Sequence, residues 1–158
     1  MLNLKEQIME RKQFKTTIDA PREKVWETLW GEQTYPQWTS PFAEGSQAKT
    51  DWKKGSRVLF LDGKGQGMVS EIADNVPNEF MSIRHLGVLQ DGKEEFETAK
   101  GKGWSGAMEN YTLKTVNGKT ELTVDQDIED EYKDMFLENW PKALEKLKNI
   151  AEQVEHDA

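Results

Sequence analysis

The sequence contains no cysteine and only two histidines, His85 and His156. The lack of cysteine excludes disulfide frameworks, thiolate nucleophiles and cysteine-bearing zinc sites. A histidine pair for metal binding is excluded as well, because His156 lies in a polar C-terminal end that no core would hold. We therefore expect a protein of the reducing cytoplasm, without a metal or a cofactor.

Long hydrophobic runs and an excess of positive charge are also missing. The first eleven residues mix Leu2, Leu4 and Ile8 with charged side chains, so they form neither a signal peptide nor a spanning segment. The formal net charge is −8 and the pI is about 4.9. An acidic surface repels phosphate backbones and anionic membranes, so we predict neither nucleic-acid binding nor membrane insertion.

Sequence motifs for catalysis are lacking too. No Gly-x-Ser-x-Gly elbow occurs, so a serine triad built on His85 has no support. Glycines 63, 65 and 67 fall within a hairpin rather than before a helix, which favours a tight turn with a bulge over a phosphate-binding loop. We assign no catalytic residue from motifs.

The order of hydrophobic periodicities indicates an α+β fold in one domain, residues 1–158, with a core at about 11–155. A strand at 14–18 precedes a helix that Pro21 opens and Gly31 closes, and a shorter helix covers 32–38. Alternating runs predict strands at 47–50, 57–62, 66–73, 79–86, 107–116 and 119–126. Asn117-Gly118 predicts a type I′ hairpin between the last two. Five glycines and many charges predict a mobile loop at 87–106, with at most one helical turn.

The clearest pattern is a C-terminal helix at 129–154, in which Pro141 marks a kink or a division. One helix can cover only one face of an antiparallel sheet, so alternate strand residues face inward. The inward set by this rule is Val58, Phe60, Met68, Ile72, Met81, Ile83, Tyr111, Leu113, Leu122 and Val124, with His85 and Glu109 next along the strands.

Several short motifs resemble the START-like SRPBCC superfamily, and more narrowly the activator of heat-shock protein 90 ATPase homologue family. They are Ile18-Asp19-Ala20-Pro21 with Val25-Trp26 and Leu29, Trp38 with Pro41, Gly55, Gly67 with Val69, Glu71 and Ile72, Asn117-Gly118-Lys119-Thr120 with Leu122, and Asn139-Trp140-Pro141 with Leu144 and Leu147. The resemblance implies a helix-grip fold: a curved six- to seven-stranded antiparallel sheet around a long C-terminal helix, with two short helices after the first strand and an internal cavity.

The superfamily includes lipid carriers, hormone receptors and aromatic polyketide cyclases, and fold alone does not choose among them. The eukaryotic co-chaperone that names the family has a second domain, for which 158 residues leave no room. A chaperone partner therefore stays open without support from the sequence.

We predict that a small apolar, aromatic or lipid-like ligand binds in the cavity. The residues expected to line it are Trp38, Phe60, Met68, Met81, Ile83, His85, Trp104, Glu109, Tyr111, Phe136, Trp140 and Leu144. Two hypotheses follow from this set. The protein is a non-catalytic carrier, or it is a cyclase-like or lyase-like enzyme in which His85 and Glu109 do acid–base work.

Overall fold

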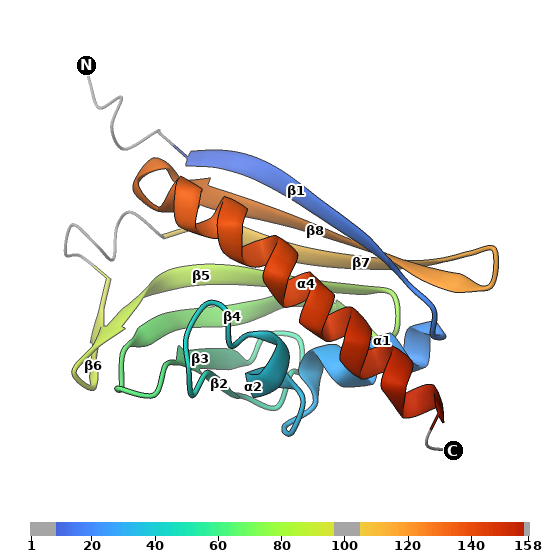
Figure 1. Ribbon diagram of the computed structural model, residues 1–158. Helices are drawn as coiled ribbons and strands as arrows, with labels where there is room; N and C mark the ends of the chain where they lie inside the picture. Colours follow the sequence, from blue (N-terminus) through green and yellow to red (C-terminus); the bar gives the residue numbers. More distant parts are fainter. Residues whose placement is uncertain (1–8, 97–104, 157–158) are drawn as a thin grey trace.

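The computed structural model of the chain describes residues 9–96 and 105–156. These residues form one curved antiparallel sheet in the order β1-β8-β7-β5-β4-β3-β2, with β6 paired to β5, and a long helix α4 that crosses it (Figure 1). The elements are β1 (Met9–Ile18), α1 (Arg22–Trp30), α2 (Tyr35–Trp38), β2 (Gln47–Lys49), β3 (Arg57–Leu61), β4 (Gly67–Val76), β5 (Phe80–Gln90), β6 (Lys93–Glu95), β7 (Met108–Val116), β8 (Lys119–Glu129), the 3₁₀ turn η2 (Asp130–Tyr132) and α4 (Lys133–His156). This is the predicted helix-grip fold.

The predicted hairpin between the last two strands is confirmed. Val116 pairs with Lys119, which leaves Asn117 and Gly118 as the two turn residues, with φ of 53° and 81°. Positive φ at both central positions defines the type I′ turn, whose twist matches that of the flanking strands.

Both strands of the β1–β8 pair extend beyond the sequence-based prediction, at the end where Met9 faces Glu129. β1 begins at Met9, where it pairs with Glu129, and not at Phe14. Polar pairs such as Arg11 with Asp127 stand on the outer face there, so the apolar alternation is weak. On the inner face of β8 burial continues to Ile128, which is why a strand and the turn η2 replace the first turn of the predicted helix.

The predicted loop at 87–106 is wrong over its first part. β5 continues through Gly87 to Gln90, and a two-residue Asp91-Gly92 turn with positive φ at both residues leads into β6. Gly87 is required by close packing, because a Cβ there would lie 2.5 Å from the carbonyl oxygen of Glu95 and 2.6 Å from Cδ1 of Phe96. That glycine signalled a close approach inside a strand and not a loop.

The core lies between the inner face of the sheet and two helices, the second half of α4 and α1, whose Val25 and Leu29 are fully buried. Ala143, Leu144, Leu147 and Ala151 are buried on the helix, opposite inward-facing strand residues such as Leu122. α4 is continuous through Pro141. No helix among the described residues is long and apolar enough to cross a membrane.

We predict that Leu144→Ala lowers the free energy of unfolding by about 2–5 kcal/mol, the usual cost of a large-to-small change in a packed core. Leu137→Ala is the matched control, because Leu137 lies on the same helix and is 40% exposed. Chemical denaturation of both variants measures the difference. Equal losses at the two positions would contradict the assignment of the Leu144 side as the buried face.

Candidate ligand cavity

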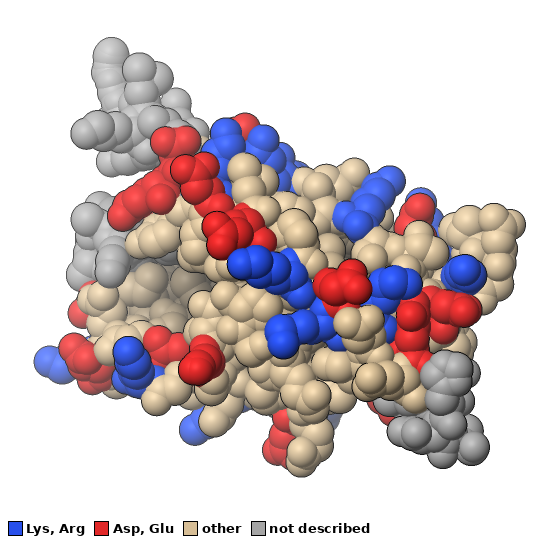
Figure 2. All heavy atoms as spheres, viewed as in Figure 1, with Lys and Arg blue, Asp and Glu red and all other residues tan. Residues whose placement is uncertain are grey.

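A cavity of about 740 Å³ lies at the end of the sheet that the second half of α4 does not cover. The first half of α4 lines it on one side together with α2 and the turn after it, and strands β3, β4, β5, β7 and β8 contribute the rest. The surface is hollowed on the left of the view in Figure 2. A cavity of this size accommodates a ligand of drug-like dimensions.

The structure brings most of the predicted site residues together on this cavity. Those that line it are Trp38, Phe60, Met68, His85, Glu109, Tyr111, Phe136 and Trp140. Whether they bind a ligand stays a prediction. Trp104 lies outside the described residues.

Three predicted residues lie in the core and not on the cavity. Met81 and Ile83 are fully buried, and Leu144 is 4% exposed. They face the predicted side, but they belong to the packed cluster that α1 and the second half of α4 complete, and not to the cavity wall. Alternation predicts which face of the sheet a strand residue lies on. It does not predict which part of that face a helix covers.

Aromatic rings make up much of the cavity wall. Trp140 lies against Phe42 with ring centroids 5.1 Å apart, and 6.1 Å from both Trp38 and Tyr111. Phe60 lies 6.2 Å from the ring of Tyr35. Offset and edge-to-face ring pairs of this kind form a rigid apolar surface suited to a flat hydrophobic ligand.

A β-bulge brings His85 to this apolar wall. Ser70 pairs with His85 while Val69 pairs with Gly87, so Leu86 is the extra residue of β5. The bulge changes the alternation, and therefore both His85 and Val88 face the cavity. On the neighbouring strand, Glu109 pairs with Ile83 and faces the same side as Tyr111.

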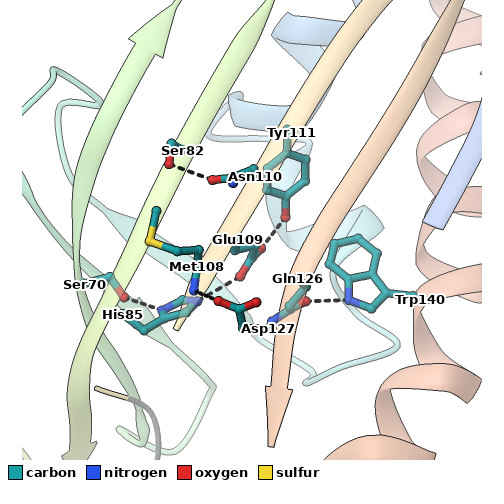
Figure 3. Close-up of polar contacts among 10 residues, drawn as sticks. All are labelled: Ser70, Ser82, His85, Met108, Glu109, Asn110, Tyr111, Gln126, Asp127 and Trp140. Atoms are coloured by element: carbon teal, nitrogen blue, oxygen red, sulfur yellow. Dashed lines mark hydrogen bonds and ion pairs between the residues drawn. The ribbon is translucent and has the colours of Figure 1, made fainter. Parts of the chain in front are cut away.

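The polar residues form a hydrogen-bonded chain across three strands (Figure 3). His85 Nδ1 lies 2.7 Å from Ser70 Oγ, and His85 Nε2 lies 3.0 Å from Glu109 Oε1. The Tyr111 hydroxyl donates to Glu109 Oε2. Ser70 is fully buried and does not line the cavity, so it holds the imidazole and cannot act as a nucleophile on a bound molecule.

The phenol of Tyr111 is held in its protonated form. Its burial, together with the negative charge of Glu109, raises the pKa of Tyr111 well above the ordinary value. Burial and the same charge raise the pKa of Tyr35. Both phenols are therefore neutral over the physiological pH range, while the Glu109 carboxylate offers acceptor oxygens beside the cavity.

Gln126, which was not among the predicted site residues, adds an amide to the polar end. Gln126 pairs with Glu109 across β7 and β8, is 3% exposed and lines the cavity. Its Oε1 accepts a hydrogen bond of 2.7 Å from Trp140 Nε1. The alternation that identified Leu122 and Val124 as inward residues continues to Gln126, the last residue of the predicted strand, so the signal was present but the inward set stopped at Val124. Tyr35 was missed because the four residues of α2 are too few to show a helical period, and Phe42 was missed because it lies in an irregular connection.

Asp127 supports the site from the outer side of the sheet. Its Oδ2 accepts a hydrogen bond of 2.9 Å from the backbone N–H of Met108, the residue before Glu109, and its Oδ1 accepts one of 2.9 Å from Arg11 Nε. Burial opposes ionisation of Asp127, but the hydrogen bonds from Arg11 and Met108 outweigh it, so the pKa of Asp127 lies below its ordinary value of 3.8.

Among the side chains that the structure describes, no group of three or more histidine, cysteine, aspartate or glutamate residues is placed to hold a metal ion.

Residues 19–152 match the family model described as Activator of Hsp90 ATPase homolog 1-like protein. The chain belongs to this family. No curated protein matches the sequence. Among solved structures, protein MLL2253 from Mesorhizobium loti is similar, at 16% identity and a TM-score of 0.72, over 91% of this chain and 98% of that one. The Aha1 dimer of Colwellia psychrerythraea is 18% identical with a TM-score of 0.71, over 90% and 96% of the two chains.

A third similar structure is DynU16, described as a putative protein in the dynemicin biosynthetic locus. It is 18% identical with a TM-score of 0.66, and the match covers 88% of this family member and 46% of DynU16. At these identities the three likenesses establish the helix-grip fold and nothing about the ligand.

We predict that neutral His85 carries its proton on Nε2. An ionised Glu109 has no proton to give, so Nε2–H donates to it and Ser70 donates to Nδ1. Long-range ¹⁵N–¹H spectra at alkaline pH distinguish the two tautomers, and Ser70→Ala should leave the Nε2–H form in place. A proton on Nδ1 in the wild-type protein would show that Glu109 is itself protonated.

We predict that Asp127→Asn destabilises the protein near neutral pH, and that the difference from wild type disappears in acid. Because the folded pKa is lowered, the stabilisation is complete above 3.8 and is lost as the pH falls through the folded value. Urea unfolding as a function of pH measures this. Asp125→Asn is the control, since it removes the same charge from the same strand, where Asp125 accepts a hydrogen bond from the neutral side chain of Gln13. A pH-independent difference would contradict the role of the charge.

Proposed function

We propose that this protein binds and carries a small apolar, aromatic or lipid-like molecule in the cavity beside Trp140. The observation that carries the proposal is an aromatic-walled space of about 740 Å³ with a few polar groups gathered at one end. Such a combination gives affinity through apolar contact and orientation through hydrogen bonds.

The side chains of the cavity wall favour a class of ligands, flat hydrophobic molecules, and do not specify a single compound. Rings of Trp38, Phe42 and Trp140 offer flat contact, while Met68 and Met135 have flexible side chains that adapt to different shapes. Moderate promiscuity among flat hydrophobic molecules is the expected behaviour. The cysteine-free sequence favours the cytoplasm as the place where this occurs.

A second candidate function is acid–base catalysis on the bound molecule, because the His85–Glu109 pair reaches the same cavity. The description of DynU16 as a putative protein of a biosynthetic locus is compatible with it. Mass spectrometry separates the two functions. A ligand recovered unchanged after long incubation with the protein supports carriage, and a change of mass or isomeric form supports catalysis.

Activation of a chaperone, the activity in the family's description, has no feature of the described residues in its favour beyond family membership. It is retained as a comparison in the binding experiments, where an Hsp90 protein can be titrated in place of a small molecule.

The test is a substitution that fills the cavity. Ala43 lines it and is half-buried, so we expect Ala43→Trp to weaken binding of flat aromatic ligands at least tenfold, on the order of 1.4 kcal/mol. Ligand titrations followed by native mass spectrometry measure the affinity. Val116→Trp is the control, because it adds the same ring at a hairpin position that is 43% exposed and outside the cavity. Equal affinities of the two variants would place the ligand elsewhere.

A further inference from the structure

The charges on the cavity are of one sign. Three carboxylates line it, those of Asp62, Asp91 and Glu109, and the described residues of the lining include no lysine or arginine. In a partly apolar site a charged group without a partner is costly, so the ligand is selected partly by its charge.

Among the described residues, neutral groups hold the two aspartates. Asp62 Oδ1 accepts hydrogen bonds from the backbone N–H groups of Lys64, at 2.7 Å, and Gln66, at 3.0 Å. Asp91 Oδ1 accepts one of 2.8 Å from the side-chain amide of Gln66. These contacts orient the carboxylates and leave their negative charge in place.

His85 does not reverse this balance. It is 4% exposed and paired with Glu109, so a protonated imidazole would neutralise that carboxylate and leave the two aspartates in excess. A carboxylate on a ligand therefore meets repulsion from Asp62 and Asp91, and no lysine or arginine of the described lining offsets it.

The polar end also specifies the direction of hydrogen bonding. Glu109 receives Tyr111 on one oxygen and His85 on the other, and a carboxylate has about four lone-pair sites, so it can accept a further donor from a ligand. Beside it, the bond from Trp140 fixes Oε1 of Gln126, since an indole N–H can only donate. The amide nitrogen of Gln126 lies on the side away from Trp140 (Figure 3).

A hydroxyl group satisfies both neighbours at once. Its O–H donates to Glu109 and its oxygen accepts from the Gln126 amide, whereas an ether oxygen can only accept and a carboxylate adds a charge. We infer that the cavity selects an uncharged flat molecule whose polar end is a hydroxyl group, and that it disfavours the same molecule ending in a carboxylate. This inference rests on the proposed function, which names the cavity but not the polar group of the ligand.

The experiment uses three probes with one aromatic body: 1-hydroxypyrene, 1-methoxypyrene and pyrene-1-carboxylate. Fluorescence titration of the wild-type protein should give dissociation constants at least about tenfold lower for the hydroxyl probe than for the other two, as expected for a hydrogen bond to a charged group. This comparison needs no variant and so does not depend on whether a variant folds.

Glu109→Gln should bring the affinities for the hydroxyl and methoxy probes within about threefold of each other, because it removes the charged acceptor, while Asp62 and Asp91 still disfavour the carboxylate probe. Glu121→Gln is the control. It removes a carboxylate from the outer face of the sheet, on β8, and should keep the wild-type preference. Thermal unfolding checks that both variants are folded.

The outcomes separate the two proposals. Equal binding of all three probes by the wild-type protein, or tightest binding of the carboxylate, overturns the selection of a hydroxyl group and leaves the proposed function standing. Binding of none of them, in a protein that is folded, counts against the proposed function and removes this inference with it. A preference for the hydroxyl over the methoxy probe that survives in Glu109→Gln overturns the role given to Glu109.

Discussion

The packing of Ala143, Leu144 and Leu147 onto the sheet determines where everything else in the molecule can lie. A nearly straight helix cannot follow a curved sheet along its whole length, so close contact over one half leaves space under the other. In this protein the second half of α4 makes the contact and the first half, with Met135, Phe136 and Trp140, borders the cavity. The core and the cavity thus both result from the difference in curvature between the helix and the sheet.

Much of this arrangement could be predicted from sequence because it depends on local periodicity. The two-residue alternation in β8 and the helical spacing in α4 gave the inner faces correctly, and Asn117-Gly118 gave the hairpin. The boundary between core and cavity could not be predicted, since Met81 and Phe60 both face inward by alternation, and only the packing of the helices separates the core residue from the cavity residue. β6 was missed because Gly87 is equally typical of a loop and of a crowded strand.

The polar end shows how buried charge is tolerated in an apolar wall. An isolated carboxylate there would be costly, but Glu109 receives donors from Tyr111 and His85, and Ser70 supports the far side of the imidazole. Each member comes from a strand whose register is fixed by its neighbours, so the chain of hydrogen bonds is pre-formed before any ligand arrives. Pre-formed polar groups reduce the ordering cost of binding and give it a direction.

The bulge at Leu86 has an evolutionary consequence. In a regular strand, gain or loss of one residue inverts every side chain beyond it and usually ruins the sheet. Here the extra residue lies at the border between the core part of β5 and the cavity part, and the strand already absorbs it. An insertion or deletion at this border would exchange the side chains at the end of the cavity, such as Val88, while Met81 and Ile83 kept their places. A change in chain length could in this way alter ligand preference in descendants of this protein without a new fold.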